Sequence, residues 1–411
     1  MKNPVTIDNA DPAAGSAATS VSPRRARRRP PRRFLLIALT VVGLLHAYVG
    51  FRLLPALHLD IGALVSAAVL LAVSTLLIPL SLASPLYSGR LPKFFETALV
   101  WGGLIATGLA SSLLVLTLLR DLLLLPAAFW LGIGNLQVAE HDSAWAVFAL
   151  AAVLTLIGLF NARRAPRIVE IDIPLASLPP ALHGFRIAQI SDIHVGPTIK
   201  RAFLQRIVEQ VNTLDAHVVA ITGDLVDGSV AELSRHTEAL QGLRSTHGSF
   251  FVTGNHEYYS GADAWVRELR RLGITVLQNA HVSLQHAGAS LLVAGVTDYS
   301  AHRFGAQHRS DPQAAAHGAP ASDARILLAH QPRSAPAAAA AGFQLQLSGH
   351  THGGQFFPWN LFVPLQQPFT AGLHRLNDLW VYTSRGTGYW GPPKRLGAPA
   401  EITLLRLVPA A

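Results

Sequence analysis

Long apolar stretches in the first 160 residues constrain the fold of this chain more than any other feature. A helix rises about 1.5 Å per residue, so about 20 apolar residues are needed to cross the hydrocarbon core of a bilayer. The pattern therefore predicts about four transmembrane helices within residues 34–161. A shorter apolar piece that contains a proline, residues 122–134, is expected to lie at the interface or to form a re-entrant turn. The four long stretches are residues 34–54, 61–83, 97–119 and 144–160.

Cationic residues flank these stretches unevenly. The first 33 residues are expected to be disordered and basic, and residues 24–33 alone contain seven arginines. That run, the pair Arg90 and Lys93, and three arginines after the fourth stretch would all face one side of the membrane. Because positive charge marks the cytoplasmic side, we expect the C-terminal half to be cytoplasmic, at a bacterial-type inner or cell membrane. The alternative is the exported face, since residues 31–37 are loosely similar to a twin-arginine export signal.

Net charge and cysteine content narrow the chemistry. The net charge is +9, but the main basic run directly precedes an apolar segment and is more simply explained as a topology signal. We expect no nucleic-acid partner, because no basic patch interleaved with aromatic residues follows it. The chain contains no cysteine, so a metal site must use nitrogen and oxygen ligands.

The pattern of apolar and polar residues changes after residue 168. Short β-branched or apolar runs now alternate with helical patterns such as residues 203–214 and 263–273. Strands that alternate with helices predict a layered α/β domain, which we assign to residues 168–411. The strand-like runs are residues 186–191, 217–222, 248–253, 274–279, 290–296, 325–330 and 343–348.

Five of these runs end in polar side chains that packing alone would not select. Taken singly, each has a structural explanation as a turn or a helix cap. Ligands bind at the carboxyl ends of strands in open α/β sheets, so the repetition favours one shared site. Its carboxylate, imidazole and amide groups suit divalent ions such as Mn, Fe or Zn. The five segments are SDIH (191–194), GDLVD (223–227), GNHE (254–257), AH (329–330) and GHTH (349–352).

The order Asp-x-His, Gly-Asp-x-x-Asp, Gly-Asn-His-Glu, His, Gly-His-x-His resembles the calcineurin-like metallophosphoesterase superfamily over about residues 186–407. GHTHGGQ and the closing residues 384–407 are similar to the YkuE-like and YaeI-like membrane-associated branch. The resemblance implies a four-layer α/β/β/α sandwich and two divalent metal ions. By that resemblance, one ion is bound by Asp192, His194 and His352 and the other by Asn255, His330 and His350, with Asp224 bridging both.

The resemblance also implies a mechanism. Two metal ions would lower the pKa of a bridging water and hold the phosphate oxygens for in-line attack by hydroxide. His256 would approach the phosphoryl oxygen or the leaving group as a cation or general acid. Asp227 and Glu257 are expected to orient imidazoles from behind, and a structural role as caps is equally open for both.

The combined expectation is a membrane-anchored phosphoesterase that cleaves a phosphodiester or pyrophosphate bond. Anchoring by several helices favours a lipid-linked substrate, and the resembled branch implies UDP-2,3-diacylglucosamine as a specific candidate. The alternatives are a transporter or sensor with a regulatory metallophosphoesterase-like domain, which the few ionisable groups in the apolar stretches disfavour, and an inactive scaffold. Late aromatic residues would line an acyl pocket or lie on the membrane, although we favour their being partly buried core of the closing strands; they are Phe356, Phe357, Trp359, Trp380, Tyr389 and Trp390.

Overall fold

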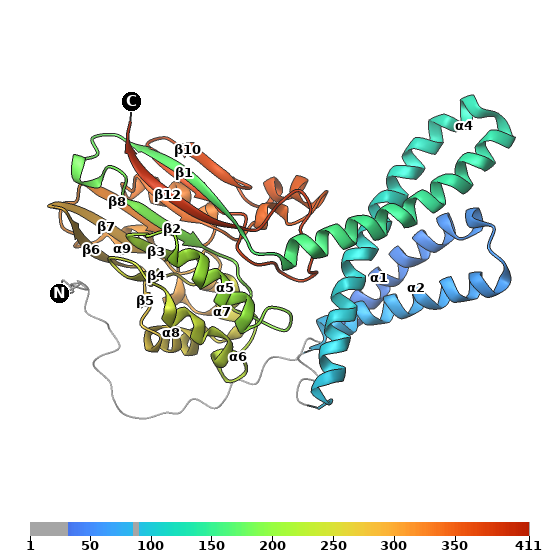
Figure 1. The fold of residues 1–411 in the computed structure, drawn as a ribbon, viewed down its shortest axis with the longest axis horizontal. Coiled ribbons are helices and arrows are strands. Elements are labelled where there is room, and N and C mark those ends of the chain that lie inside the picture. Colours follow the sequence, from blue (N-terminus) through green and yellow to red (C-terminus); the bar gives the residue numbers. More distant parts are fainter. Residues whose placement is uncertain (1–31, 85–89, 411) are drawn as a thin grey trace. The chain divides into compact units, whose positions relative to one another are not determined.

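The computed structural model describes residues 32–84 and 90–410 (Figure 1). The basic N-terminal segment predicted to be disordered lies outside this range except for its last two residues, which begin a helix. The described chain divides into two compact units. The helical unit holds the described residues up to Phe160 with Gly391–Lys394, and the α/β unit holds Asn161–Trp390 and the residues from Arg395 onward.

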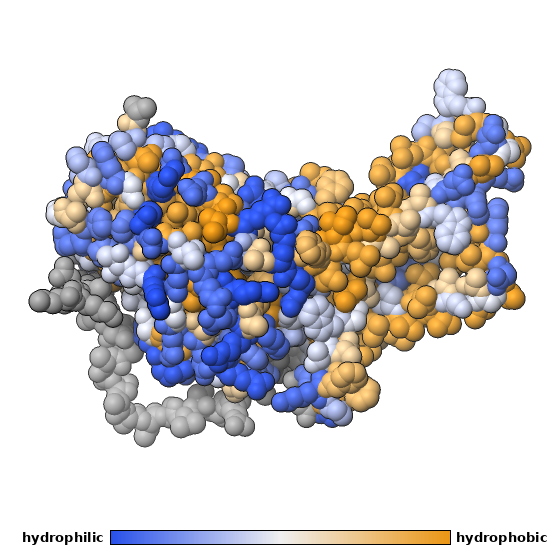
Figure 2. Space-filling model, viewed as in Figure 1, coloured by the Kyte–Doolittle hydropathy of each residue, from blue (hydrophilic) through white to orange (hydrophobic). Residues whose placement is uncertain are grey.

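Among the described residues, three helices of the helical unit are long and apolar enough to cross a membrane. They are α1 (Arg32–Leu53), α2 (Ile61–Leu82) and α4 (Lys93–Arg163). Large apolar side chains cover most of the face of this unit that Figure 2 shows; Phe129, for example, is 89% exposed. A water-soluble unit does not leave so much contiguous apolar surface uncovered, so these helices associate with a bilayer.

The sequence predicted about four spans, and the third and fourth of them are the two arms of α4. Gly132 has non-helical dihedral angles (φ 67°, ψ 164°), and the chain reverses there. The arms lie side by side, because the Arg120 guanidinium on the first donates hydrogen bonds to Ser143 Oγ and the Glu140 carbonyl on the second, both over 2.9 Å. Residues 122–134 continue the first arm as helix up to the break and so contain the turn itself.

Two six-stranded sheets form the centre of the α/β unit. Both sheets are mixed, since β12 runs antiparallel to β2 in the first, and β6–β7 and β10–β11 are antiparallel pairs in the second. The first has the order β1 (Arg167–Leu175), β12 (Glu401–Pro409), β2 (Arg186–Ile190), β3 (Val218–Ile221), β4 (Ser249–Phe251), β5 (Thr275–Val276). The second has the order β10 (Gly372–Leu376), β11 (Leu379–Thr383), β9 (Leu345–Ser348), β8 (Ala324–Leu328), β7 (Ala289–Gly295), β6 (Ala280–His286).

Helices cover the outer faces of the two sheets, so the unit is a layered α/β/β/α sandwich. Successive side chains of a strand point to opposite faces of its sheet. Ile187 of β2 therefore packs between the sheets with Leu345 of β9, whereas its neighbour Ala188 packs on the outer side with Phe203 of α5 (Arg201–Asn212). A third apolar cluster joins the second sheet to α9 (Pro312–Ala316) and α10 (Ala335–Ala340).

The five polar segments singled out in the sequence follow five strands of this sandwich. β2, β3 and β4 are parallel neighbours in the first sheet, and β8 and β9 are parallel neighbours in the second. Each of the five strands ends within three residues of the polar segment that follows it. The carboxyl ends of both sheets thus deliver these segments to one place.

Candidate metal centre

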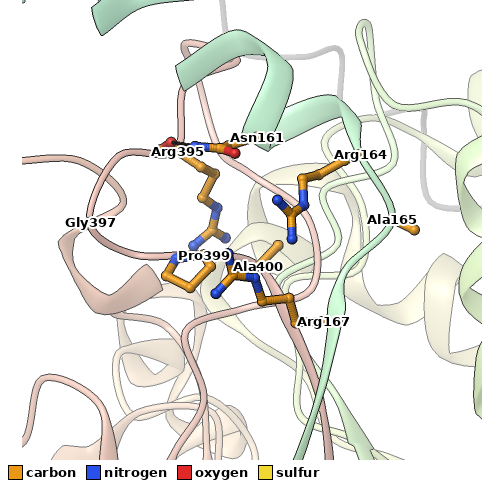
Figure 3. A pocket seen from close by; sticks show the side chains of 8 residues that line it. All are labelled: Asn161, Arg164, Ala165, Arg167, Arg395, Gly397, Pro399 and Ala400. Carbon is orange, nitrogen blue, oxygen red and sulfur yellow. Dashed lines mark hydrogen bonds between the residues drawn. The ribbon is translucent and has the colours of Figure 1, made fainter. Parts of the chain in front are cut away.

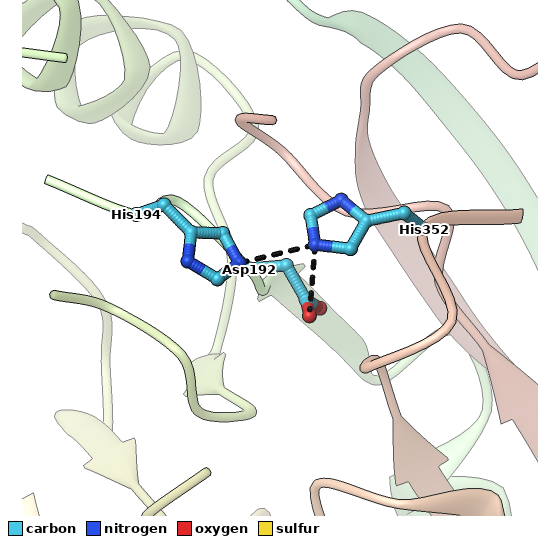
Figure 4. A group of neighbouring side chains, drawn as sticks. All are labelled: Asp192, His194 and His352. Carbon is cyan, nitrogen blue, oxygen red and sulfur yellow. Dashed lines mark hydrogen bonds and ion pairs between the residues drawn. The ribbon is translucent and has the colours of Figure 1, made fainter. Parts of the chain in front are cut away.

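Three His/Asp groups with the spacing of metal ligands lie where these segments meet; one joins His194 to Asp227 and His256, and the other two contain the residues expected as ligands. In the first of these two, the potential ligand atoms of Asp192, His194 and His352 all lie within 4.8 Å of one another (Figure 4). Nε2 of His194 is 3.0 Å from Nε2 of His352, which is itself 3.6 Å from Oδ1 of Asp192. Two imidazole nitrogens and a carboxylate oxygen are thus directed at one point.

The second group contains Asp224, His330 and His350. Nε2 of His330 lies 3.2 Å from Asp224 Oδ2 and 3.2 Å from His350 Nδ1. The same Asp224 oxygen is 3.9 Å from Nε2 of His194, a member of the first group. Asp224 therefore stands between the two groups, which together contain every residue that the resemblance implied as a ligand except Asn255.

The residues of both groups fit divalent metal ions. Oδ1 of Asn255 is buried and accepts no hydrogen bond from any described residue, although a buried amide oxygen normally has a partner. His330 donates from Nδ1 to the Thr222 carbonyl over 2.8 Å, so Nε2, which faces Asp224, is the atom that would bind a metal ion once its proton is lost. An orphaned amide oxygen, carboxylates and imidazole lone pairs form a donor set for Mn, Fe or Zn.

Strained backbone brings most of these side chains into position. Five of the seven residues have φ in the left-handed region, which residues with a Cβ rarely adopt and which costs about 1–3 kcal/mol each. Such strain concentrates at functional sites that the surrounding fold holds in place. The five are Asp192 (54°), His194 (56°), Asp224 (51°), His350 (70°) and His352 (52°).

Two glycines make room for the carboxylates. A Cβ on Gly254 would lie 2.2 Å from Asp224 Oδ1, and a Cβ on Gly349 would lie 2.1 Å from Asp192 Oδ2. The backbone therefore reaches each carboxylate only because the position has no side chain. The next residue in GHTH uses this approach, since the His350 amide donates a hydrogen bond to Asp192 Oδ1 over 2.9 Å.

Asp227 supports two histidines at once. Its Oδ1 accepts hydrogen bonds from Nδ1 of His194 over 3.0 Å and from Nδ1 of His256 over 2.6 Å. The first bond leaves the Nε2 lone pair of His194 free to face the ligand group. The second fixes the His256 ring, whose side chain is 16% exposed, at the edge of the site.

Glu257 accepts hydrogen bonds from backbone amides rather than from imidazole rings. Its buried carboxylate accepts hydrogen bonds from the amides of Gly254 (2.7 Å), Asp224 (3.0 Å) and Leu225 (2.8 Å). The residue also completes the capping box of α7 (Asn255–Ser260). Of the two roles that the sequence left open, the structural cap is the one these contacts describe. Burial and the nearby Asp224 raise the pKa of Glu257 to about 7.

The pKa shifts in the two groups follow from burial and from the neighbouring charge. Burial lowers the pKa of His350 to about 3, helped by the His330 cation. Burial would do the same to His330, but the charges of Asp224 and Asp192 raise its pKa well above the usual value. Burial opposes the charge of Asp224, yet His330 and His256 hold its pKa well below the usual range.

His256 differs from the ligand histidines. Burial opposes its charge, but the Asp224 charge and the hydrogen bond to Asp227 raise its pKa to about 9. Its backbone amide donates to Asp224 Oδ1 over 2.9 Å, so the ring stands beside the bridging carboxylate. A protonated imidazole at the rim of the site is suited to donate a proton or to bind an anion.

Sequence reasoning missed Arg395. Its side chain is only 1% exposed; its guanidinium lies 3.0 Å from Nδ1 of His352 and donates a hydrogen bond to the His352 carbonyl over 3.1 Å. Burial together with this cation lowers the pKa of His352 well below its usual value, which keeps the ring uncharged. No spacing motif marks Arg395, which stands 43 residues after its partner.

Comparisons with known proteins agree with this geometry. A sequence model described as calcineurin-like phosphoesterase matches residues 185–354. A transmembrane protein with metallophosphoesterase domain from Danio rerio is 40% identical over 276 residues, which cover 65% of this chain and 63% of that protein. An uncharacterized metallophosphoesterase from Campylobacter jejuni is 34% identical over 263 residues, and this match covers 64% of this chain and 68% of that protein.

A more distant relative, the uncharacterized metallophosphoesterase YkuE from Bacillus subtilis, is 28% identical over 58% of this chain and 84% of its own length. The match with the relative from Bos taurus, also a transmembrane protein with metallophosphoesterase domain, is 41% identical and covers 61% of that protein. This chain thus spans about three fifths of the length of the two vertebrate relatives.

Proposed function

This chain belongs to the calcineurin-like metallophosphoesterase family, and from that premise we propose that it is a membrane-anchored hydrolase of a phosphodiester or pyrophosphate bond. The observation that carries the proposal is the pair of His/Asp groups joined through Asp224. We assign one metal ion to Asp192, His194 and His352 and a second to Asn255, His330 and His350. Asp224 would contribute to both metal sites, and Mn is the metal that we would test first, before Fe and Zn.

When bound, the two ions lower the pKa of water and neutralise the charge of the phosphoryl group. The residues of the chain position the imidazole rings and supply a proton. Asp227 holds the rings of His194 and His256 through their Nδ1 atoms, so that Nε2 of each faces the site. His256 is a cation below about pH 9 and is assigned the role of proton donor to the leaving oxygen.

We further propose a lipid-linked substrate, because two exposed aromatic side chains lie beside His256. The rings of Tyr259 and Trp390 lie 5.3 Å and 5.8 Å from the His256 ring and are 61% and 54% exposed. Phe357 and Trp359, which follow the GHTH segment closely, are 59% and 43% exposed. Burial in the core, which the sequence favoured, is wrong for three of these late aromatic residues: Phe357, Trp359 and Trp390.

Exposed aromatic side chains favour the boundary between headgroups and acyl chains. The charge of this region also suits an anionic lipid surface, because no acidic residue occurs between Asp323 and Asp378. A substrate such as UDP-2,3-diacylglucosamine combines the required phosphoester chemistry with acyl chains. The flanking arginines and Lys93 support the proposal that the site lies at the cytoplasmic face.

The transporter or sensor hypothesis has less support. Ionisable side chains inside helical membrane proteins mark transport pathways when they face a cavity. Here Arg52 forms an ion pair with Asp121 over 2.7 Å, and Asp121 also accepts from Arg120 and from the Tyr48 hydroxyl. These contacts tie helices together, which favours an anchoring role for the helical unit.

The proposal is tested by hydrolysis assays on the full chain in detergent. Metal-stripped protein is expected to hydrolyse bis(p-nitrophenyl) phosphate only after Mn, Fe or Zn is added. Asp224→Asn is expected to abolish that activity, whereas the matched change Asp172→Asn, on a carboxylate paired with Arg406 on β12, is expected to preserve it. Metal-independent hydrolysis, or equal activity in both variants, would contradict the assignment.

The lipid portion needs its own comparison. UDP-2,3-diacylglucosamine and its unacylated counterpart are presented in mixed micelles to the same preparation. We expect a higher kcat/KM for the acylated compound. Equal values for the two compounds would leave the metal hydrolase intact and remove the proposal of a lipid-linked substrate.

A further inference from the structure

A cavity of about 250 Å³ in the α/β unit has a strongly cationic lining. It lies beside the start of β1 and the loop that precedes β12. Figure 3 shows the side chains of Arg164, Arg167 and Arg395 extending toward one another across it, with no acidic residue in the lining. The other lining residues are Asn161, Ala165, Gly397, Pro399 and Ala400.

The three arginines contribute differently. Arg395 is buried, and its guanidinium is already bonded to the carbonyls of Gly388, His352 and Ala398 and to the His352 ring, so it supplies charge rather than free donors. Arg164 and Arg167 form no ion pair or side-chain hydrogen bond with any residue in the described ranges 32–84 and 90–410. Their donors are available to a ligand.

Nearby carboxylates do not balance this charge. Glu401, the acidic residue next to Ala400 in the chain, accepts hydrogen bonds from the Tyr382 hydroxyl and from Arg385. Asp172 on β1 pairs with Arg406 over 2.8 Å. Asp192 and Glu401 partly offset the charge of Arg395, but neither lines the cavity, so the lining keeps an excess of positive charge that favours an anion.

The chemistry of the free donors selects the anion. A guanidinium presents a planar set of N–H groups that matches the oxygens of phosphate in a bidentate manner. The volume is below the range of about 300–1,000 Å³ that is usual for a complete small-molecule pocket. It suits a phosphate group with a short attachment, such as a lipid headgroup, or inorganic phosphate.

We propose that this cavity is a phosphate-binding site separate from the metal centre, with Arg164 and Arg167 as its hydrogen-bond donors. The residues named as metal ligands do not line it. The site begins at Asn161, directly after the last apolar stretch of the sequence, so both a lipid phosphate and free phosphate are accessible sources. The proposal does not depend on the assigned hydrolase activity.

The test uses the full chain in detergent after removal of metal, so that phosphate binding by metal ions does not contribute. One arm measures binding of radiolabelled inorganic phosphate by equilibrium dialysis, and the other measures binding of phosphatidic acid by native mass spectrometry. Arg164→Gln/Arg167→Gln is compared with Arg375→Gln/Arg406→Gln, which removes the same charge from arginines that pair with surface carboxylates instead.

We expect wild-type protein and the control pair to bind at least one of the two probes, and the Arg164/Arg167 pair to bind that probe at least tenfold more weakly. The arm that responds identifies the source of the phosphate. Thermal unfolding should be unchanged in the double variant, because neither arginine has a described partner to lose. Wild-type protein that binds neither probe, or an equal loss in both double variants, would overturn the proposal.

Discussion

Nε2 of His194 and Nε2 of His352 lie 3.0 Å apart, although 158 residues separate them in the chain. The two histidines follow strands of different sheets, so the distance depends on how the whole sandwich closes. His194 is fixed from behind by Asp227, and His352 by Arg395. Contacts from several loops thus direct two imidazole nitrogens at one point, which is the requirement of a metal site.

Metal binding should release protons. Asp224 and Asp192 raise the pKa of His330 well above its usual value, so this histidine carries a proton at neutral pH in metal-free protein. A metal ion needs the Nε2 lone pair and must displace that proton. Affinity for Mn is therefore expected to rise with pH and to fall as the solution is acidified.

Calorimetry in buffers of different ionisation enthalpy measures the number of protons released. We expect a positive number near neutral pH for wild-type protein and a smaller one for His330→Gln. His374→Gln, which alters a histidine bonded to the Ala371 carbonyl away from the two groups, serves as the control. Affinity for Mn that is independent of pH would contradict this assignment.

Asp227→Asn should show whether Asp227 positions the histidine rings without itself binding a metal ion. The amide keeps the size of the side chain but has no charge to hold both Nδ1–H groups. Replacing such outer partners typically costs 10–100-fold in metal affinity or activity, and we expect a loss of about that size in kcat/KM. The variant should still bind metal at raised concentration, as measured by mass spectrometry of the metal content. Unchanged kinetics would show that Asp227 does not position these rings.

The pH profile of hydrolysis should reveal His256. Its pKa of about 9 means that the protonated form is lost as pH rises through that value. Positive metal ions nearby can only lower the pKa, so the descending limb of kcat should lie at or below about pH 9. His256→Gln should lower kcat by about 10²–10⁴-fold and remove that limb. A variant that keeps the limb would assign the titration to another group.

Gly349→Ala should disturb the site through sterics alone. The added Cβ would lie 2.0 Å from Ser191 Oγ and 2.1 Å from Asp192 Oδ2, both of which are buried. Overpacking of this kind typically costs about 1–3 kcal/mol, and we expect a lower free energy of unfolding together with weaker metal binding. Gly242→Ala, whose Cβ would meet only Val208 at 3.4 Å, is the control measured by the same thermal unfolding. Equal stability of the two variants would contradict the described packing.

The exposed aromatic rim should matter only for lipid substrates. Trp390→Ala removes a half-exposed ring beside His256 without touching a proposed ligand. We expect its kcat/KM to fall several-fold for an acylated substrate in micelles and to stay unchanged for bis(p-nitrophenyl) phosphate. A parallel loss on both substrates would mean that Trp390 supports the site rather than the acyl chains.

Sequence patterns predicted the centre of the α/β unit well and its margins poorly. The buried runs that became β2, β3, β8 and β9 were recognised because both of their faces are covered, which produces continuous apolar segments. β1 was missed although Val169 to Ile173 alternates apolar and polar residues, and its parallel partner β12 lies more than 200 residues further along the chain. Edge strands of this kind depend on tertiary pairing that local pattern does not reveal.

The candidate site shows the same division. Short motifs pointed to Asp224 and His256 because five polar segments followed five buried strands, a repetition that turns and caps alone do not explain. Arg395 and the cationic cavity had no such signal, since their contacts form only when the loop before β12 returns to the GHTH segment. Local strain also escaped prediction, because a positive φ at Asp192 or His350 is imposed by the surrounding fold.

The most direct test of the two-metal assignment is hydrolysis of bis(p-nitrophenyl) phosphate as a function of the Mn bound per chain, with metal content measured on the same samples by mass spectrometry. Activity is expected to stay near zero below one bound ion per chain, and to reach its maximum only as occupancy approaches two. Full activity in metal-free protein, or a maximum already at one ion per chain, would contradict a bimetallic site bridged by Asp224.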